Sequence, residues 1–279
     1  MSPDDARYRA LHALPSDAGA VAPLLDALKD ASWRVRRLAV ERLGELQPTP
    51  SVIASLLGLL ALREEPGARN AAASVLSQLG SPALPSLVSL LRHADADQRK
   101  FAAEILGALR RPEAAEALLE ALRDTDPNVQ VAAAEALGQV GGPAARQALE
   151  ALLSAPAHLL RICALNGLTA LGAPPPLPAI LPLLDHPLTR RSAWLVLGLV
   201  EHPTAALLTV RALASAECRD AALGSLGAPR RRLSPEQASA LRASLRAVPD
   251  VRRWLAQALA SDDERHAGAM LVTRALGDP

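Results

Sequence analysis

The sequence predicts an all-α fold, an α-α superhelix built as a solenoid of about eight helix pairs with end-capping helices. One segment recurs about every 31 residues along the 279-residue chain, which is typical of a repeat architecture. Within each copy the apolar residues return at helical spacing. Aromatic residues make up only 2% of the chain, whereas β-sandwiches and barrels favour aromatic and β-branched residues. Half of the residues are apolar, which excludes a disordered chain.

The recurring segment is an apolar helix whose first clear copy is VRRLAVERLGEL, residues 35–46. Later copies include QRKFAAEILGAL (98–109), VQVAAAEALGQV (129–140) and LRICALNGLTAL (160–171). Alignment of the copies gives three columns. The arginine column is Arg36, Arg69, Arg99, Gln130, Arg161, Arg190, Arg219 and Arg252; the alanine column is Ala39, Ala72, Ala102, Ala133, Ala164, Ala193, Ala222 and then Leu255; the leucine column is Leu43, Leu76, Leu106, Leu137, Leu168, Leu197, Leu226 and Leu259.

Each copy is predicted to be a helix pair in which the recurring segment is the second helix. A first apolar helix precedes it, as at 21–29, 82–92 and 113–123. Serine followed by proline begins two of these first helices, at Ser81-Pro82 and Ser234-Pro235. Prolines further in are expected to kink the first helix, and glycines are expected to end the second. The prolines are Pro23, Pro85, Pro178 and Pro182, and the glycines are Gly141, Gly172 and Gly227.

These repeats resemble those of HEAT-repeat solenoids, as in PEAAEALLEALRDTDPNVQVAAAEALGQVG at 112–141. They are most similar to the short-repeat variety named after the phycobilisome (bilin) lyases, over residues 16–261. The resemblance implies a HEAT/armadillo-like fold and leaves the activity open, since such repeats serve many functions.

We expect one solenoid over 1–279, with an N-terminal cap helix in 1–15, eight repeats in 16–261 and a C-terminal cap helix in 262–279. The N-terminal helix is predicted at 4–14, with Leu11 in the leucine column. The C-terminal helix is predicted at 264–276, after Asp262-Asp263. Its apolar side is expected to hold Ala267, Met270, Leu271 and Leu276.

Helical geometry assigns two faces to the second helix. The positions of Val35, Ala39, Leu43 and Leu46 form the predicted buried stripe. Those of Arg34, Arg37, Glu41 and Glu45 lie opposite, on the expected exposed inner surface of the solenoid. The arginine column lies at the flank, where each side chain is expected to bond an acid or a carbonyl in a nearby turn; a phosphate-binding ladder is the alternative. The candidate acceptors are Asp30, Asp95, Asp124 and Asp185.

The exposed positions of the second helix become apolar in repeats 5 and 6. Large apolar groups on a solvent face often mark an interaction site, so we expect a partner or dimer surface there, with local self-burial as the alternative. Trp33 is a candidate anchor beside two arginines or a packing residue of its turn, Trp194 is expected to rim the apolar patch, and Trp254 is expected in the core. The residues predicted to bind a partner are Trp33, Arg34, Arg37, Val131, Leu159, Ile162, Leu188, Arg191, Trp194, Leu195 and Leu199.

No catalytic, cofactor or metal site is predicted. The motifs GxxxxGK, HExxH and GxSxG are missing. The deoxyhypusine hydroxylases, a related HEAT family, hold iron with His-Glu pairs, but none of the six histidines here is followed by glutamate. His93 and His186, near Asp95 and Asp185, are expected to be solvated turn residues, with a metal site as the alternative.

The expected function is therefore a non-enzymatic scaffold or adaptor in the bacterial cytoplasm that binds a protein on the inner second-helix face. A homodimer through the apolar patch is a further possibility. One alternative is a bilin-lyase-like role in handling a chromophore protein. The other is DNA binding or repair, which the cluster Arg230–Arg232 favours and the net charge of +1 disfavours. The two cysteines exclude a disulfide scaffold, and no apolar stretch is long enough to span a membrane.

Overall fold

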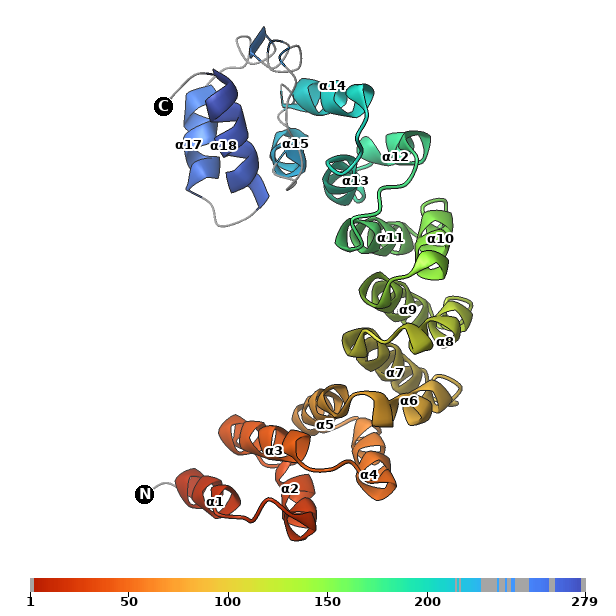
Figure 1. Ribbon diagram of the computed structural model, residues 1–279, viewed down its shortest axis with the longest axis vertical. Coiled ribbons are helices and arrows are strands. Elements are labelled where there is room, and N and C mark those ends of the chain that lie inside the picture. Colours follow the sequence, from red (N-terminus) through yellow and green to blue (C-terminus); the bar gives the residue numbers. More distant parts are fainter. Residues whose placement is uncertain are drawn as a thin grey trace. The chain divides into compact units, whose positions relative to one another are not determined.

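The computed structural model describes residues 3–213, 215, 217–226, 235, 239, 242–243, 251–260 and 264–276. These residues form α-helices and short 3-10 helices, and this part of the chain contains no strand (Figure 1). The chain divides into two compact units, Met1–Gly142 and Pro143–Pro279. Several predicted features lie outside the described residues: Gly227, Arg230–Arg232, Ser234, Asp262-Asp263 and the side chains of Arg252, Trp254, Ala267, Leu271 and Leu276.

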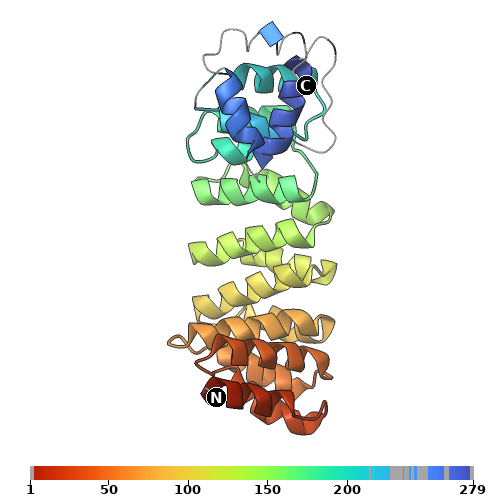
Figure 2. The same cartoon turned by 90° about the vertical axis from the view of Figure 1, so that its left-hand side faces the viewer.

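The N-terminal unit begins with a single helix and continues with four helix pairs, which are repeats 1 to 4. Each first helix packs against the second helix of its own repeat, and successive second helices pack against one another. Figure 2 shows these helices, red to yellow-green, as adjacent rungs. The single helix is α1 (Pro3–His12); the first helices are α2 (Val21–Ala27), α4 (Pro50–Leu60), α6 (Leu84–Leu90) and α8 (Ala115–Ala121); the second helices are α3 (Trp33–Glu45), α5 (Pro66–Leu79), α7 (Ala96–Leu109) and α9 (Pro127–Val140).

In its described residues the C-terminal unit holds three further pairs, repeats 5 to 7, and two more helices. Its second helices also pack in succession, α11 on α13 and α13 on α15. The first helices are α10 (Pro143–Leu152), α12 (Leu177–Leu184) and α14 (Pro203–Ala212); the second helices are α11 (His158–Ala170), α13 (Arg190–Leu197) and α15 (Arg219–Leu226); the last two helices are α17 (Val251–Leu259) and α18 (Glu264–Leu276).

The prolines of the first helices lie near helix starts more often than the sequence suggested. A 3-10 turn precedes α2 and α6, so Pro23 and Pro85 lie in the first turn of the α-helix that follows. Pro178 is likewise at the start of α12. The missing N–H costs nothing there, because the first-turn N–H groups have no acceptor within the helix. These three prolines therefore lie nearer the start of their α-helices than predicted, and the expected kinks stay predictions; of the four, Pro182 alone lies inside its α-helix.

The alanine and leucine columns form the core, as predicted. Every described alanine of its column is buried, and so is Leu255, which replaces it in α17. The leucine column is buried from Leu43 to Leu226. Second helices end at the expected glycines, since Gly141 and Gly172 adopt positive φ angles of 76° and 60°. The sequence period therefore places the interfaces between repeats correctly.

Helices α7 and α9 approach closely through small residues. A Cβ atom at Gly107 of α7 would lie 2.8 Å from both Cα and Cβ of Ala136 on α9. Both residues are almost fully buried. The two backbones therefore meet with almost no side-chain volume between them, which only glycine opposite a small residue permits.

The C-terminal helix α18 packs against both α17 and α15. Glycine makes the second contact possible, because a Cβ atom at Gly268 would overlap the backbone carbonyl of Leu223 on α15. The buried side of α18 holds Ala269 and Val272, and the expected apolar residue Met270 is 56% exposed. The helix boundaries were predicted correctly, but Met270 was placed on the wrong face.

The substitution Gly107→Ala should lower the free energy of unfolding by about 1–3 kcal/mol, because the added methyl overpacks the contact with Ala136. Gly58→Ala is the matched control, since its Cβ would meet nothing within 4 Å. The control should raise stability by about 0.5–1 kcal/mol through helix propensity. Urea denaturation followed by circular dichroism measures both; equal effects of the two variants would contradict the close approach.

Candidate functional site

In several repeats the arginine column closes the turn between the two helices of the repeat. Arg36 donates to the backbone oxygen of Asp30, six residues earlier, at 2.6 Å, and Arg99 donates to that of His93 at 2.9 Å. Gln130 makes the same bond to Asp124 at 2.7 Å, with an amide in place of the guanidinium. In the C-terminal unit Arg219 donates to the carbonyl of Leu213 at 3.0 Å. These groups satisfy carbonyls at the end of the first helix, which has no intrahelical donors for them.

Some column arginines also join neighbouring repeats. Arg99 forms a two-pronged ion pair with Asp124 of the next repeat, at 2.7 and 2.8 Å, and both side chains are almost buried. Arg190 reaches Glu217 of the next repeat at 3.3 Å. The hydrogen bonds from Arg99 hold the pKa of the Asp124 carboxyl below its ordinary value. This charged junction explains the arginine better than a phosphate ladder does.

The predicted acceptors are partly correct. Asp124 accepts from a column arginine through its carboxylate, and Asp30 and Asp185 accept only through their backbone oxygens. The carboxylate of Asp30 instead pairs with Arg7 of α1 at 2.7 Å. Asp95 pairs with Arg63, which lies outside the column, because Arg69 instead lies over the ring of Phe101. The expectation for Asp95 was therefore wrong.

The substitution Asp124→Asn should cost about 1–3 kcal/mol of stability at neutral pH, because Arg99 loses a largely buried charged partner. Since the folded-state pKa of Asp124 is lowered, its stabilising contribution is complete above the ordinary value of 3.8 and is lost as the pH falls below it. The variant should lose that part of the acid sensitivity. Denaturation of both chains between about pH 2 and 7 measures this difference in acid sensitivity.

Glu41→Gln is the control, because it breaks the exposed pair with Arg37. It should lower the free energy of unfolding by less than about 0.5 kcal/mol.

The candidate interaction surface lies on the exposed second-helix side of repeats 5 and 6, along α11 and α13. Leu159 is 54% exposed at the start of α11, and Leu188 is 60% exposed just before α13. Ile162, Leu195 and Leu199 are half-buried on the same two repeats. Equivalent positions in repeats 1, 3 and 4 carry polar or charged residues: Arg34, Asp97 and Asn128 align with Leu159, and Glu41, Glu104 and Glu135 align with Leu195. Repeats 5 and 6 therefore present aliphatic side chains where the fold itself accepts polar ones.

A polar hollow of about 480 Å³ begins beside this surface, next to Leu188. Arginines and acids line it together, and two of these pairs lie close, Arg190 with Glu217 at 3.3 Å and Arg265 with Asp220 at 3.4 Å. The candidate surface thus has an aliphatic part and a charged margin, the arrangement usual in protein interfaces. The lining residues are Pro187, Arg190, Arg191, Glu217, Asp220, Ala221 and Arg265.

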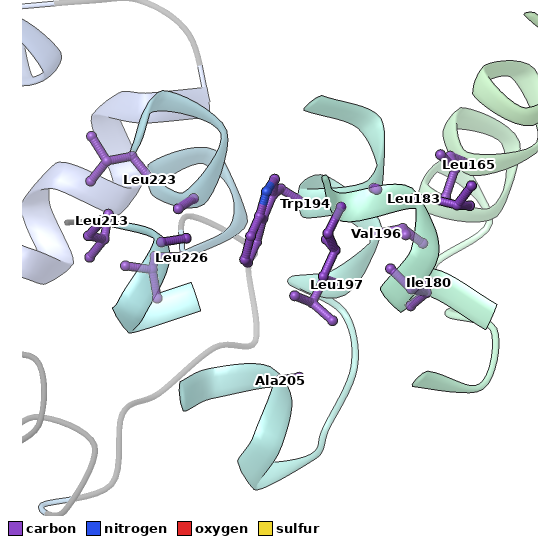
Figure 3. Close-up of a cluster of buried hydrophobic side chains, with 14 of the residues drawn as sticks. Leu165, Ile180, Leu183, Trp194, Val196, Leu197, Ala205, Leu213, Leu223 and Leu226 are labelled. Carbon is purple, nitrogen blue, oxygen red and sulfur yellow. The ribbon is translucent and has the colours of Figure 1, made fainter. Parts of the chain in front are cut away.

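Two residues that were predicted to bind a partner, Trp194 and Val131, are not part of this surface. Trp194 does not rim the surface: it is only 5% exposed on α13, and Figure 3 shows its ring among buried side chains, near Leu223 and Leu226 of α15. Its helical position is at the flank, and the neighbouring repeat covers it, which a single-helix projection does not reveal. Val131 is half-buried on α9, in the N-terminal unit.

Trp33 is 62% exposed at the first position of α3. The same position is Pro66, Ala96, Pro127 or Pro187 in other repeats, so the fold does not need an aromatic ring there. The adjacent arginines are engaged locally: Arg34 lies over the Tyr8 ring and pairs with Asp5, and Arg37 pairs with Glu41. Trp33 therefore belongs to the exposed residues of the N-terminal unit, as the sequence suggested.

The two tryptophans should respond oppositely to substitution. Trp33→Pro places the residue of other repeats at the first helical position, where proline is favoured, and should change the free energy of unfolding by less than about 0.5 kcal/mol. Trp194→Ala should cost about 3–5 kcal/mol because it leaves a cavity in the core. Denaturant unfolding measures both. A large loss in Trp33→Pro would show that this ring packs structurally.

Sequence reasoning missed one contact at the candidate surface. The rings of His158 and His186 stack with centroids 4.2 Å apart and planes inclined by 25°. The sequence predicts His186 as a solvated turn residue, whereas the structure places its half-buried ring on that of His158. The available signal was His158 at the first position of α11, where other repeats place proline.

Within the described ranges no three His, Cys, Asp or Glu side chains are grouped to hold a metal ion. Among the helices described, none has the length and apolar character needed to cross a bilayer. Cys163 is buried and Cys218 is half-buried, which agrees with the small apolar role predicted for both cysteines.

The chain matches the family model for HEAT repeats over residues 2–77, 21–100 and 84–169. No curated protein sequence matches it. Kap95p, whose binding alters the switch loops of RanGDP, is 13% identical with a TM-score of 0.54; the match covers 92% of this chain and 42% of Kap95p. Importin beta is 16% identical with a TM-score of 0.51, over 92% of this chain and 47% of importin beta.

The complex of CpcE and CpcF of phycocyanin lyase from Nostoc sp. PCC7120 contains a chain that is 24% identical, with a TM-score of 0.47. That match covers 53% of this chain and 99% of the other. This chain spans less than half the length of Kap95p and of importin beta. At these identities the likeness concerns the fold, an all-α helical solenoid.

Proposed function

The chain belongs to the HEAT-repeat family, and from that premise we propose that it is a non-enzymatic scaffold or adaptor that binds a protein partner. The contact surface is the second-helix side of repeats 5 and 6. The observation that carries the proposal is the exposure of Leu159 and Leu188, which share a repeat position that is polar in repeats 1, 3 and 4. Exposed aliphatic side chains lower the solubility of a protein and do not stabilise its fold, so their presence favours an interaction site.

The surface indicates the chemistry of the partner segment. Leucine and isoleucine side chains favour aliphatic groups, as on the apolar stripe of an amphipathic helix. The hollow beside Leu188 carries both signs of charge, from Arg191, Glu217 and others, so a charged residue next to the partner's aliphatic stripe fits its margin. We therefore expect an amphipathic protein segment with aliphatic anchors.

The test replaces the two exposed leucines with residues that other repeats carry at the same position. Leu159→Asn copies Asn128, and Leu188→Asp copies Asp97, so the double variant should fold normally. Proteins from a lysate of the source organism are captured on the immobilised wild-type chain and identified by mass spectrometry. The affinity of each purified partner is then measured by calorimetry, and the double variant should bind at least about tenfold more weakly, or about 1.4 kcal/mol.

Leu181→Gln is the matched control, because Leu181 is 40% exposed on the first helix α12, away from the second-helix side. It should bind the partner as the wild type does. Equal binding by the wild type and the folded double variant would overturn the proposed surface. Capture of nucleic acid alone, released by high salt, would overturn the protein-scaffold function itself.

A further inference from the structure

The junction between repeats 5 and 6 differs in chemistry from two other junctions of the chain. Two charged junctions are described above: Arg99 pairs with Asp124 between repeats 3 and 4, and Arg190 pairs with Glu217 between repeats 6 and 7. Between repeats 5 and 6 the contact at this edge is the stack of His158 on His186. The position that Asp124 holds in repeat 4 is Leu184 in repeat 6, so the acid is replaced.

The column arginine of this junction, Arg161, bonds only within its own repeat in the contacts described. It donates to the carbonyl of Pro156 at 3.1 Å, and its buried Nε has no hydrogen-bond partner. The edge therefore brings together one permanent cation and two imidazoles. Neutral imidazoles stack favourably, whereas two imidazolium rings 4.2 Å apart beside a guanidinium repel one another.

The surroundings provide little compensation for added positive charge. On α10 Arg146 is paired with Glu150, and α12 carries no charged residue. On the side of repeats 6 and 7, Arg190 is paired with Glu217, Arg191 lines the hollow and Asp185 precedes His186 in the chain. The buried Nδ1 of His158 has no hydrogen-bond partner. Desolvation, then the charges of Arg161 and His186, lower the pKa of His158 below its ordinary value.

The second imidazole is tied directly to the proposed partner surface. The Nδ1 atom of His186 accepts a hydrogen bond from the backbone N–H of Leu188 at 3.2 Å. The stacked pair therefore connects both sides of the surface, since His158 adjoins Leu159 in the chain and His186 holds the turn that presents Leu188.

We propose that the stacked pair of His158 and His186 is an acid-sensitive latch, which keeps the junction between repeats 5 and 6 closed at neutral pH and opens it on acidification. Opening of the latch then displaces Leu159 and Leu188 and releases the protein partner. This step rests on the proposed function. The ligand that operates the latch is the proton.

The direction of the pH effect follows from linkage. Because His158 binds a proton less readily in the folded chain, its contribution to stability is complete above the ordinary pKa of 6.5 and is lost as the pH falls below that value. The latch should therefore open in the mildly acidic range.

The first experiment uses the free full-length chain. Hydrogen–deuterium exchange, corrected for intrinsic rates, is measured at about pH 7.5 and about pH 5.5. Peptides covering 158–162 and 186–191 should exchange about tenfold faster in acid. His93 and His202 are internal controls, because each accepts the same type of bond from a backbone N–H two residues ahead and neither stacks on another imidazole in the described contacts. Their turns should respond less.

Two variants remove the ring pair while keeping the local backbone. His186→Asn retains a side-chain oxygen for the Leu188 N–H, as Asp126 does for Asn128 at 2.8 Å. His158→Pro copies Pro66 and Pro127 at the first helical position, and the preceding residue, Ala157, already has the extended backbone that proline requires. Both variants should lose the excess acid response, and NMR titration of His186→Asn should show the pKa of His158 raised towards its ordinary value.

A wild-type chain whose two segments respond no more than the His93 and His202 turns would overturn the latch. The same conclusion follows if both folded variants keep the full acid response. These outcomes do not depend on any partner, so they are separate from failure of the proposed function. With a partner identified by capture, wild-type affinity should fall about tenfold at pH 5.5, while His186→Asn holds its affinity. Affinity that does not change with pH would overturn the coupling to release.

Discussion

The bond from the arginine column to a carbonyl five or six residues earlier sets the geometry of the repeats that contain it, which are repeat 1 and repeats 3 to 7. It ties the start of the second helix to the end of the first, at Arg36, Arg99 and Gln130 alike. A fixed angle between paired helices lets each alanine and leucine meet the equivalent column of the next repeat. Because glutamine replaces arginine in repeat 4, the essential element is a donor that reaches the carbonyl, and charge is needed only where a neighbouring acid also has to be held.

Because the arginine, alanine and leucine columns stabilise the fold, the exposed positions of the second helices are available for binding. At the positions of Leu159 and Leu195, repeats 1, 3 and 4 carry charged or amide side chains. Repeat 5 carries Leu159 and Ile162 on this side, and repeat 6 carries Leu188 and Leu195. The aliphatic patch, the charged hollow at its margin and the imidazole stack lie in consecutive repeats of one compact unit. Recognition and its proposed control by protons are therefore built from the same two turns.

The parts of the structure that repeat were predictable from the sequence, and the parts that do not were not. The buried columns, the α18 boundaries and the carboxylate of Asp124 follow from periodicity and turn chemistry. Trp194 was misplaced because a neighbouring repeat covers it, which one helix projected alone does not show. Asp95 lost its expected partner because Arg69 found the ring of Phe101 instead. The His158–His186 stack joins residues 28 positions apart, across a junction that no single repeat contains.

The close approach at Gly107 makes the repeats unlike interchangeable modules. The equivalent position is glycine in repeats 1, 4, 6 and 7 as well, and it is Ser77 in repeat 2 and Thr169 in repeat 5. In repeat 6 a Cβ at Gly198 would lie 2.5 Å from the backbone oxygen of Ser225. The junctions of Gly107 and Gly198 also carry the pairs Arg99–Asp124 and Arg190–Glu217, and the threonine junction carries the imidazoles. Threonine in place of Gly107 or Gly198 would put side-chain volume where the neighbouring helix leaves no room for a Cβ atom. Repeat 5 therefore cannot stand in for repeat 3 or repeat 6 without a change at this position, and the junctions fix the order of these repeats.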